Sequence, residues 1–358
     1  MQAPTDPSGE QPRPRWASRS AVAWFTLFVG LSVLVMTVGR TVSAPPSLLV
    51  LVLVVSPIWT LLVGLVGAGF VLRRPLDVRL WALLGVQLAL WFAVWGRAWW
   101  ASPVDAEGER VRVMAWNVQR LGFEDHDDGK KLACVAEAVD AVSPELVSFM
   151  EVSRRDVDRL AARLQLECEH IDYRGTGSEK RGGLAACARG PGWRLGRSGP
   201  RRFVDSSDWY FVFSEMVRDD SHQVVNLISV HLQPNSLDLT GPGSLGAVAE
   251  THHVEAGALL SRMAALQDPT VVAGDFNSTR ETPLHGALRE NLVDVWEQAA
   301  LGPGVTVRAA GVLPLRVDYI YATPDLPAAG AWIPTVDCSD HRPVVADIVL
   351  PEPWDRAR

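Results

Sequence analysis

Three long apolar runs open the chain and set its first third apart from the rest. They cover Ala21–Val38, Leu48–Leu72 and Leu80–Trp95, and the third could extend to Trp100. A helix needs about 20 apolar residues to cross a bilayer, so the pattern predicts three transmembrane helices within residues 21–100 (about 21–38, 48–72 and 80–100). Pro57 predicts a kink in the second helix. Residues 1–20, rich in Pro, Ser and Arg, predict a disordered tail.

The arginines around these runs predict which way the helices cross. The N-terminal tail carries three arginines, the first loop only Arg40, and the second loop, Arg73–Arg79, three. Because positive loops stay in the cytoplasm, the tail and the second loop are expected inside. Three spans then place everything after about Trp100 outside the cell. This orientation depends on the third span, since two spans would invert it.

From residue 110 the pattern changes to short apolar strands alternating with amphipathic helices, after a polar linker at 101–109. Residues 110–350 are expected to form one α/β domain, and 351–358 a tail. Strands are predicted at 111–116, 146–150, 182–188, 211–217, 224–230, 270–273, 317–321 and 344–349, and helices at 130–141, 156–164, 248–266 and 284–290. Hairpin-like neighbours beside helices favour a sandwich with mixed sheets.

The net charge also changes sign near residue 100. Residues 1–100 hold eight arginines and three acids, a net charge of +5, whereas the remainder holds 26 basic and 38 acidic residues, a net charge of −12. An acidic domain gains nothing from non-specific attraction to a long polyanion, which weakly favours a small or lipid phosphoester over bulk nucleic acid. The four cysteines lack metal-binding spacing. Disulfides are permitted in an extracytoplasmic domain, but the sequence does not pair them.

The segment Val271–Asn277 suggests chemistry. A buried strand stops at Gly274, and Asp275 and Asn277 follow two residues apart, so both side chains can point to one side of an extended segment. A carboxylate can hold a hard cation or take a proton, and a carboxamide can donate to an oxyanion. An Asx turn is the alternative explanation, and it is the better one for an isolated pair.

Other polar residues also stand where strands end. Together with the Asp275 pair they form one set: Asn117, Glu151, His231, Asp275, Asn277, Asp318, Asp340 and His341. Most have ordinary alternatives as turn, cap or core residues. Asp318 is harder to dismiss, because an acid in an apolar strand is costly without a partner. Ligands of open α/β sites gather at strand ends, so the set as a whole predicts a site.

The local contexts of these residues resemble a known family, the metal-dependent endonuclease/exonuclease/phosphatase superfamily related to DNase I. The matching segments are Trp116-Asn117-Val118, Met150-Glu151, Arg181–Ala185, Ser229–Leu232, Gly274–Asn277, Val317–Ile320 and Ser339–Pro343. The resemblance implies a four-layer sandwich of two mixed β-sheets flanked by helices. It also implies Mg²⁺ or Mn²⁺ as cofactor and hydrolysis of a phosphate ester.

Residue roles follow from this resemblance together with side-chain chemistry. The expected metal residues are Asn117, Glu151 and Asp340, and the expected catalytic residues are His231, Asp275, Asn277, Asp318 and His341. Asp318 would orient the ring of His341, while His231 and Asn277 would hydrogen-bond the phosphoryl oxygens. Whether Asp275 or His341 is the general base stays open, as does the number of metals.

Three further residues or pairs receive weaker assignments. Tyr173 and Arg181 are candidate phosphate contacts. His252 and His253 are expected to be surface residues of a helix rather than ligands.

The sequence as a whole predicts a membrane-anchored hydrolase of phosphodiesters or phosphomonoesters that faces outward. Its expected partners are the bilayer and a phosphoester substrate, whether a lipid headgroup, a small molecule or nucleic acid; no protein partner is implied. The alternatives are a nuclease acting on extracellular DNA or RNA and a non-catalytic phospho-ligand binding module. A transporter role is disfavoured because the three runs carry almost no internal polar groups.

Overall fold

The computed structural model describes residues 16–38, 42, 46–73, 75–95, 108–121, 128–172, 182–203, 210–235, 240–241, 243–309 and 311–351. The chain divides into two compact units. Unit 1 comprises Met1–Val38 and Val55–Gly96, and unit 2 comprises Gly39–Val54 and Arg97–Arg358. The linker expected at 101–109 and the tail at 351–358 fall largely outside the described residues.

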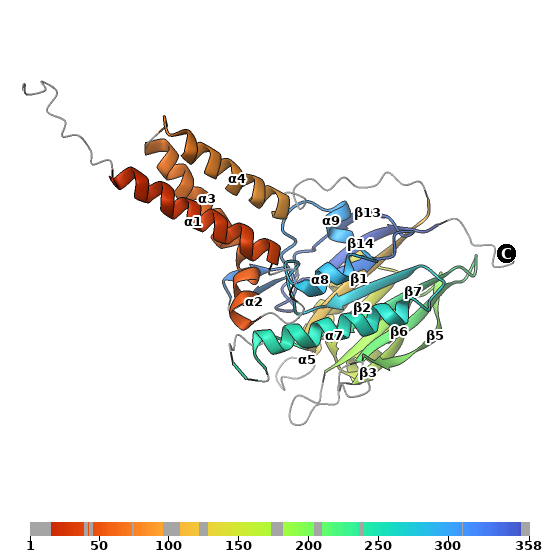
Figure 1. Ribbon diagram of the computed structural model, residues 1–358. Coiled ribbons are helices and arrows are strands. Elements are labelled where there is room, and N and C mark those ends of the chain that lie inside the picture. The colour runs from red at the N-terminus through yellow and green to blue at the C-terminus, as the bar shows by residue number, and fades with distance from the viewer. Residues whose placement is uncertain are drawn as a thin grey trace, which may run out of the picture. The chain divides into compact units, whose positions relative to one another are not determined.

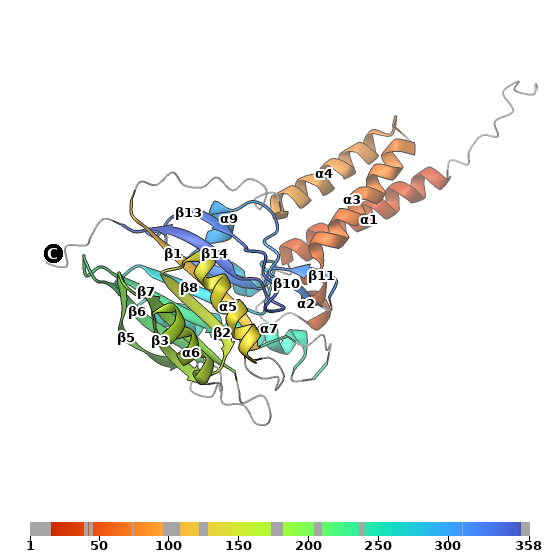
Figure 2. The ribbon, with the colours of Figure 1, turned by 180° about the vertical axis from the view of Figure 1, so that it is seen from behind.

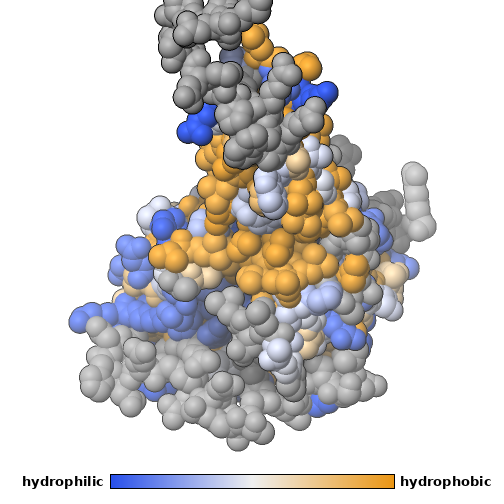
Figure 3. Space-filling view, turned by 60° about the vertical axis from the view of Figure 1, so that its left-hand side comes forward, coloured by the Kyte–Doolittle hydropathy of each residue, from blue (hydrophilic) through white to orange (hydrophobic). Residues whose placement is uncertain are grey.

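Unit 1 contains three apolar helices, α1 (Trp16–Val38), α3 (Ser56–Arg73) and α4 (Val78–Trp95). Phe25 packs at their centre, against a glycine, Gly67, that leaves room for its ring. Large apolar side chains are exposed on these helices, and Figure 3 shows such a surface on one face. Helix α1 already begins at Trp16, inside the segment predicted as a disordered tail, and residues 1–15 lie outside the described residues.

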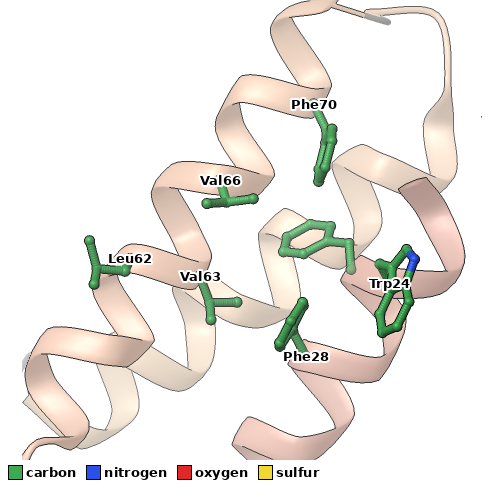
Figure 4. A pocket seen from close by; sticks show the side chains of 7 residues that line it. Trp24, Phe28, Leu62, Val63, Val66 and Phe70 are labelled. Carbon is green, nitrogen blue, oxygen red and sulfur yellow. The ribbon is translucent and has the colours of Figure 1, made fainter. Parts of the chain in front are cut away.

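An apolar hollow of about 430 Å³ lies between α1 and α3 (Figure 4). Seven side chains line it: Trp24, Phe25, Phe28, Leu62, Val63, Val66 and Phe70. It contains no acid, base or amide, so it offers nothing for ester chemistry.

Within the described residues, no single helix has both the length and the apolar composition that a membrane crossing needs. The predicted second span is instead a bent pair of helices, Ser47–Val54 and Ile58–Arg73, which reach that length only together. The shorter apolar stretches Val22–Thr37 and Val78–Phe92 lie in α1 and α4. The three-span arrangement therefore stays a prediction.

Unit 2 is built on two six-stranded mixed sheets (Figures 1 and 2). Sheet A has the order β13-β14-β1-β2-β4-β3, and sheet B the order β5-β6-β7-β8-β12-β9. The strands of sheet A are β1 (Arg110–Leu121), β2 (Leu146–Val152), β3 (Leu166–Asp172), β4 (Gly183–Arg189), β13 (Ala328–Trp332) and β14 (Val344–Val349). Those of sheet B are β5 (Trp193–Arg202), β6 (Tyr210–Arg218), β7 (Val224–His231), β8 (Thr270–Asp275), β9 (Val293–Asp294) and β12 (Asp318–Ala322).

The sheets pack face to face and each is covered by helices on its outer side. The shared core holds side chains of both sheets, such as Val113, Met150 and Ile320. Helices α5 (Asp128–Val142) and α6 (Arg154–Leu164) cover sheet A, as Figure 2 shows. Helices α7 (Leu245–Met263) and α8 (Pro283–Leu288) cover sheet B, with α7 in front in Figure 1. The predicted arrangement of two mixed sheets flanked by helices is confirmed.

The strand sequences explain this layering. Strand β7, VVNLISVH, is buried at every position, as is β8, because each lies between two packed layers. The helices are amphipathic: α6 buries Val157, Leu160 and Leu164 against sheet A and begins at Ser153, whose hydroxyl accepts the Asp156 backbone N–H. The remaining elements are α9 (Val295–Ala299) and the hairpin of β10 (Val307–Ala309) and β11 (Leu313–Leu315).

One apolar helix from the N-terminal region belongs to unit 2. Helix α2 (Ser47–Val54) packs on α7, and the Ser47 hydroxyl accepts the Gly246 backbone N–H at 3.0 Å. This bond satisfies one of the donors that a helix leaves unpaired at its first turn. Unit 2 therefore includes a segment that precedes the polar linker.

Candidate active site

Three neighbouring strands of sheet B each place one polar residue in a single row. His231 on β7 is the register partner of Asp275 on β8, and Asp275 is the register partner of Asp318 on β12. All three side chains are buried. His231 Nε2 lies 3.7 Å from Asp275 Oδ2. The row brings two carboxylates and an imidazole to one end of the sheet.

Gly274 makes this close packing of β7 and β8 possible. A Cβ at this position would lie 1.9 Å from the carbonyl oxygen of Val230 on the neighbouring strand. Any side chain would therefore push the strands apart and displace Asp275, which follows. Residue 274 therefore has to be a glycine for steric reasons.

Sheet A contributes Asn117 and Glu151 from the parallel strands β1 and β2. Asn117 pairs in register with Met150, so Glu151 stands one residue further along. The Asn117 amide donates to Glu151 Oε1 at 3.1 Å and to Asp275 Oδ2 at 3.0 Å. Glu151 has a left-handed φ of 57°, rare for a residue with a side chain and frequent at functional sites. Asn117 therefore joins the polar ends of the two sheets.

His341 and Asp318 form a hydrogen-bonded pair beside this junction. His341 Nδ1 lies 2.8 Å from Asp318 Oδ2 and 3.8 Å from Asp275 Oδ2. Burial alone would lower the pKa of His341, but the carboxylates of Asp318 and Asp275 outweigh it and raise the pKa to about 10. Burial raises the pKa of Asp318, opposed by the His341 charge. A charged imidazole that donates Nδ1–H to Asp318 has a second donor in its Nε2–H.

Asn277 sits in a turn fixed from two sides. Its backbone N–H donates to Asp275 Oδ1 at 2.8 Å, and its φ of 46° is left-handed. Its amide donates to the Leu232 carbonyl at 3.0 Å, and Asn235 donates to the Asn277 carbonyl. The bond to Asp275 is the Asx-type contact that the sequence left as an alternative, and here it lies inside a polar cluster.

Comparison with known proteins identifies the family. A model of the endonuclease/exonuclease/phosphatase family matches residues 114–341, which include every predicted site residue. The chain belongs to this family. Its members are hydrolases that act on phosphoester bonds. A search of curated proteins found no match.

Solved structures of this family share the fold of unit 2. A family protein from Bacteroides vulgatus matches with a TM-score of 0.58 at 18% identity, covering 68% of this chain and 100% of its own. The catalytic domain of human nocturnin, solved with a sulfate anion, gives 0.55 at 16% identity, with 70% and 99% covered. A mannosyl-6-phosphatase from Bacteroides thetaiotaomicron gives 0.54 at 14% identity, with 67% and 100% covered. At such identities the likeness shows the fold alone.

Within the described residues, one group of acids and histidine has its potential ligand atoms close enough to share a cation. It consists of Asp275, Asp318 and His341, whose candidate atoms lie within 4.8 Å of one another. This is a different set from the predicted metal residues Asn117, Glu151 and Asp340. Since His341 Nδ1 and Asp318 already bond each other, we interpret this group as a proton-handling cluster.

The predicted metal residues occupy different environments. The Asn117 oxygen accepts the Gln119 backbone N–H at 2.9 Å while its amide holds two carboxylates, so Asn117 orients Glu151 and Asp275. Asp340 is exposed, and its Oδ1 lies 3.3 Å from the Ser339 hydroxyl oxygen. Glu151 and Asp340 thus offer carboxylate oxygens of the kind that Mg²⁺ and Mn²⁺ prefer.

Two buried histidines behind the site were not assigned a role from the sequence. His252 on α7 is buried, so its predicted surface position is wrong; its Nε2 donates to the Gln233 carbonyl at 2.7 Å. Burial lowers the pKa of His252 to about 4, which keeps the ring neutral. His285 Nε2 donates to the Ser278 carbonyl at 3.1 Å, and its Nδ1 accepts from Tyr321. His285 thus holds Ser278, which follows Asn277, and His252 holds Gln233, which follows the Leu232 that accepts from the Asn277 amide.

The candidate phosphate contacts Tyr173 and Arg181 lie outside the described residues.

Proposed function

We propose that this protein is a metal-dependent phosphoesterase that hydrolyses a phosphodiester or phosphomonoester by attack of water. The observation that carries the proposal is the Asn117 amide, which links Glu151 of sheet A to Asp275 of sheet B beside the His341–Asp318 pair. This contact gathers one carboxylate suited to a cation, one suited to a water molecule, and one charged imidazole.

The carboxylates proposed to hold the metal come from the end of β2 and from the segment before β14. Glu151 and Asp340 would hold Mg²⁺ or Mn²⁺, with Asn117 orienting Glu151. When bound, the ion would neutralise charge that builds on the phosphoryl oxygens. No other residue of the cluster is needed as a ligand, which leaves Asp275 and His341 free for the proton transfers.

The remaining residues divide the reaction between them. Asp275 would orient the attacking water and take its proton, since its Oδ2 lies at the centre of the cluster. His341, charged through Asp318 and Asp275, would stabilise a phosphoryl oxygen or protonate the leaving group. His231 would donate to a phosphoryl oxygen. Asn277 can do the same, because an amide has two N–H donors and the Leu232 carbonyl occupies one.

The supported substrate is a small or lipid phosphoester, because residues 101–358 carry a net charge of −12. The test is a panel of phosphodiester, phosphomonoester, phospholipid, inositol phosphate and single- and double-stranded nucleic acid substrates. The full-length chain in detergent is required, since a fragment from residue 101 would lack α2. Turnover of a lipid or small ester well above that of nucleic acid is expected; preferential cleavage of DNA or RNA would establish the nuclease alternative.

The same panel distinguishes catalysis from binding. If a phosphoester raises the unfolding temperature of the protein but is not hydrolysed with either Mg²⁺ or Mn²⁺, the protein is a non-catalytic binding module.

The apolar helices would anchor the enzyme in a membrane with the catalytic unit outside. Two disulfides in unit 2, Cys134–Cys338 and Cys168–Cys187, support this side, because disulfides persist in oxidising compartments. Reporter fusions after residues 45 and 101 test the orientation. An extracytoplasmic signal at 101 is expected, and a cytoplasmic one would overturn it.

A further inference from the structure

The segment that carries Asp340 and His341 has no regular structure of its own. It joins β13 to β14 over residues 333–343 and is held by side chains rather than by strand pairing, apart from one bridge between Val307 and His341. Hydrolysis requires the reacting groups within a fraction of an ångström of their working positions. The stability of this segment therefore determines where the imidazole stands.

Ser339 is the hydrogen-bonding centre of the segment. Its hydroxyl donates to the Asn117 carbonyl at 2.8 Å and accepts the His341 backbone N–H at 3.2 Å. The Trp116 indole N–H donates to the His341 carbonyl at 3.0 Å. The segment is thus docked against the end of β1, at the residue whose amide links the two carboxylates.

A covalent bond holds the residue just before this centre. Cys338 is disulfide-bonded to Cys134 on α5, with Cα atoms 5.9 Å apart and a sequence separation of 204. Cys338 is buried in the cluster between α5, α6 and sheet A, where Cys134 also packs. The bond therefore ties an irregular segment to a helix that is fixed on the sheet.

The second disulfide provides an internal comparison. Cys168 and Cys187 are register partners on β3 and β4, 19 residues apart. Their strands are already paired through a backbone ladder, and neither cysteine adjoins a residue of the site. Loss of this bond leaves the polar cluster untouched.

We propose that the Cys134–Cys338 disulfide is a positioning element of the active site, which holds Ser339 on β1 and thereby sets His341 opposite Asp318. This inference rests on the proposed phosphoesterase function. Reduction by a dithiol breaks the S–S bond: two electrons and two protons pass to the protein, which gains two thiols, and the reductant becomes a cyclic disulfide. The freed segment then samples positions in which the imidazole is misplaced.

The kinetic test compares two double variants of the full-length chain, Cys134→Ser/Cys338→Ser and Cys168→Ser/Cys187→Ser, at a temperature where both are folded. The first is expected to lose kcat about tenfold or more with KM within about threefold, because misplacement of a reacting group affects the chemical step. The second is expected to keep both constants. Reoxidation of dithiol-treated wild-type protein should restore kcat.

Hydrogen exchange supplies a measurement independent of turnover. The amides of residues 338–342 should exchange faster in Cys134→Ser/Cys338→Ser than in wild-type protein, with no change there in the control variant. Unchanged exchange of these amides overturns the positioning role whether or not the protein hydrolyses any ester. A different outcome is that the oxidised wild-type protein is inactive while these amides exchange faster in Cys134→Ser/Cys338→Ser. That result would reject the phosphoesterase function but not the positioning role of the disulfide.

Discussion

At the residue scale, the buried ionisable groups behind the site decide how the protein responds to pH. Glu255 on α7 is buried, and the Gln233 backbone only partly offsets the cost of placing its carboxylate there. Burial raises the pKa of Glu255 to about 8. The side chain is therefore mostly protonated at neutral pH, next to the neutral ring of His252.

Glu255 makes stability depend on pH in a defined direction. Between its unfolded pKa near 4.5 and its folded pKa of about 8, the folded state binds more protons, so stability falls as pH rises and levels off above about 8. Glu255→Gln should remove this slope and stabilise the protein at pH 9, relative to wild type, by on the order of 3–5 kcal/mol. Chemical denaturation from pH 4 to 9 measures it, with the exposed Glu250→Gln on the same helix as control. A slope that persists in Glu255→Gln would contradict the assignment.

Asp318 gives a second prediction at this scale. Asp318→Asn keeps the shape of the side chain but removes the charge that holds the His341 ring and stabilises its proton. Activity should fall by roughly 10²-fold or more, the range of a lost acid–base contribution. The rate measured against pH is the test, and a rate profile equal to that of the wild type would show that the pair has no catalytic part.

A site residue could be predicted from the sequence when its immediate neighbours in the chain marked it as unusual. Asp275, Asn277 and Asp318 can be recognised because they are polar residues at the ends of apolar strands. His252 cannot, although residues 252, 255, 256 and 259 form a buried stripe on α7 with helical spacing, while His253 is exposed. The helical spacing of these residues is visible in the sequence. Histidine and glutamate are buried less often than apolar residues, however, so the sequence alone gives no reason to place this face in the core.

At the element scale, a buried ion-pair network fixes β12 behind the site. Arg316 donates to both carboxylate oxygens of Asp294, at 3.0 and 2.6 Å, and stacks over the Tyr319 ring at 4.3 Å. Asp294 also caps α9 by accepting the Trp296 backbone N–H. The network ties α9 to the strand that starts with Asp318.

Arg316→Met should be strongly destabilising, by about 3–5 kcal/mol, because it leaves the buried Asp294 charge unpaired. The double variant Arg316→Met/Asp294→Asn should recover part of this loss, since it removes the orphaned charge. Thermal and chemical unfolding of the two variants measure the difference. A double variant that is less stable than the single one would contradict the network.

The strands and helices differ in how clearly the sequence defines them. Strand β14 was predicted with its observed limits, and β7 to within one residue, because apolar and mostly β-branched residues dominate both segments. The edge strands β3, β5 and β13 and the hairpin β10–β11 were missed, since their residues mix charged and apolar types or include glycine and proline. Their pairing is fixed by neighbouring strands rather than by local preference.

At the scale of the whole molecule, the boundary between the two structural units differs from the boundary between the apolar N-terminal region and the acidic remainder of the chain. The apolar N-terminal region ends near residue 100, yet α2 packs with the catalytic unit on α7. No property of the sequence SLLVLVLV distinguishes a docked helix from a spanning one, because both are apolar. The sandwich with mixed sheets, by contrast, followed from the alternation of strands and helices, and its two sheets from the resemblance to a known family.

The docking of α2 yields a prediction for truncated proteins. A chain that starts at residue 101 should unfold at a lower temperature than one that starts at residue 39, because the first lacks the helix that covers α7 and caps it through Ser47. Both fragments can be compared by thermal unfolding in detergent, with Ser47→Ala in the longer one to isolate the cap. Equal unfolding temperatures would show that α2 does not stabilise the catalytic unit.

Metal-dependent ester hydrolysis by the purified full-length chain tests the central claim most directly. Chelator-treated protein should be inactive on a nitrophenyl phosphodiester, and Mg²⁺ or Mn²⁺ should restore the rate. Glu151→Gln should lose about 10²-fold or more in rate at saturating metal, whereas Asp325→Asn, which changes an exposed acid outside the site, should retain wild-type activity. Folded wild-type protein that stays inactive, or a rate unaffected by chelation and by Glu151→Gln, would contradict the proposed metal-dependent phosphoesterase.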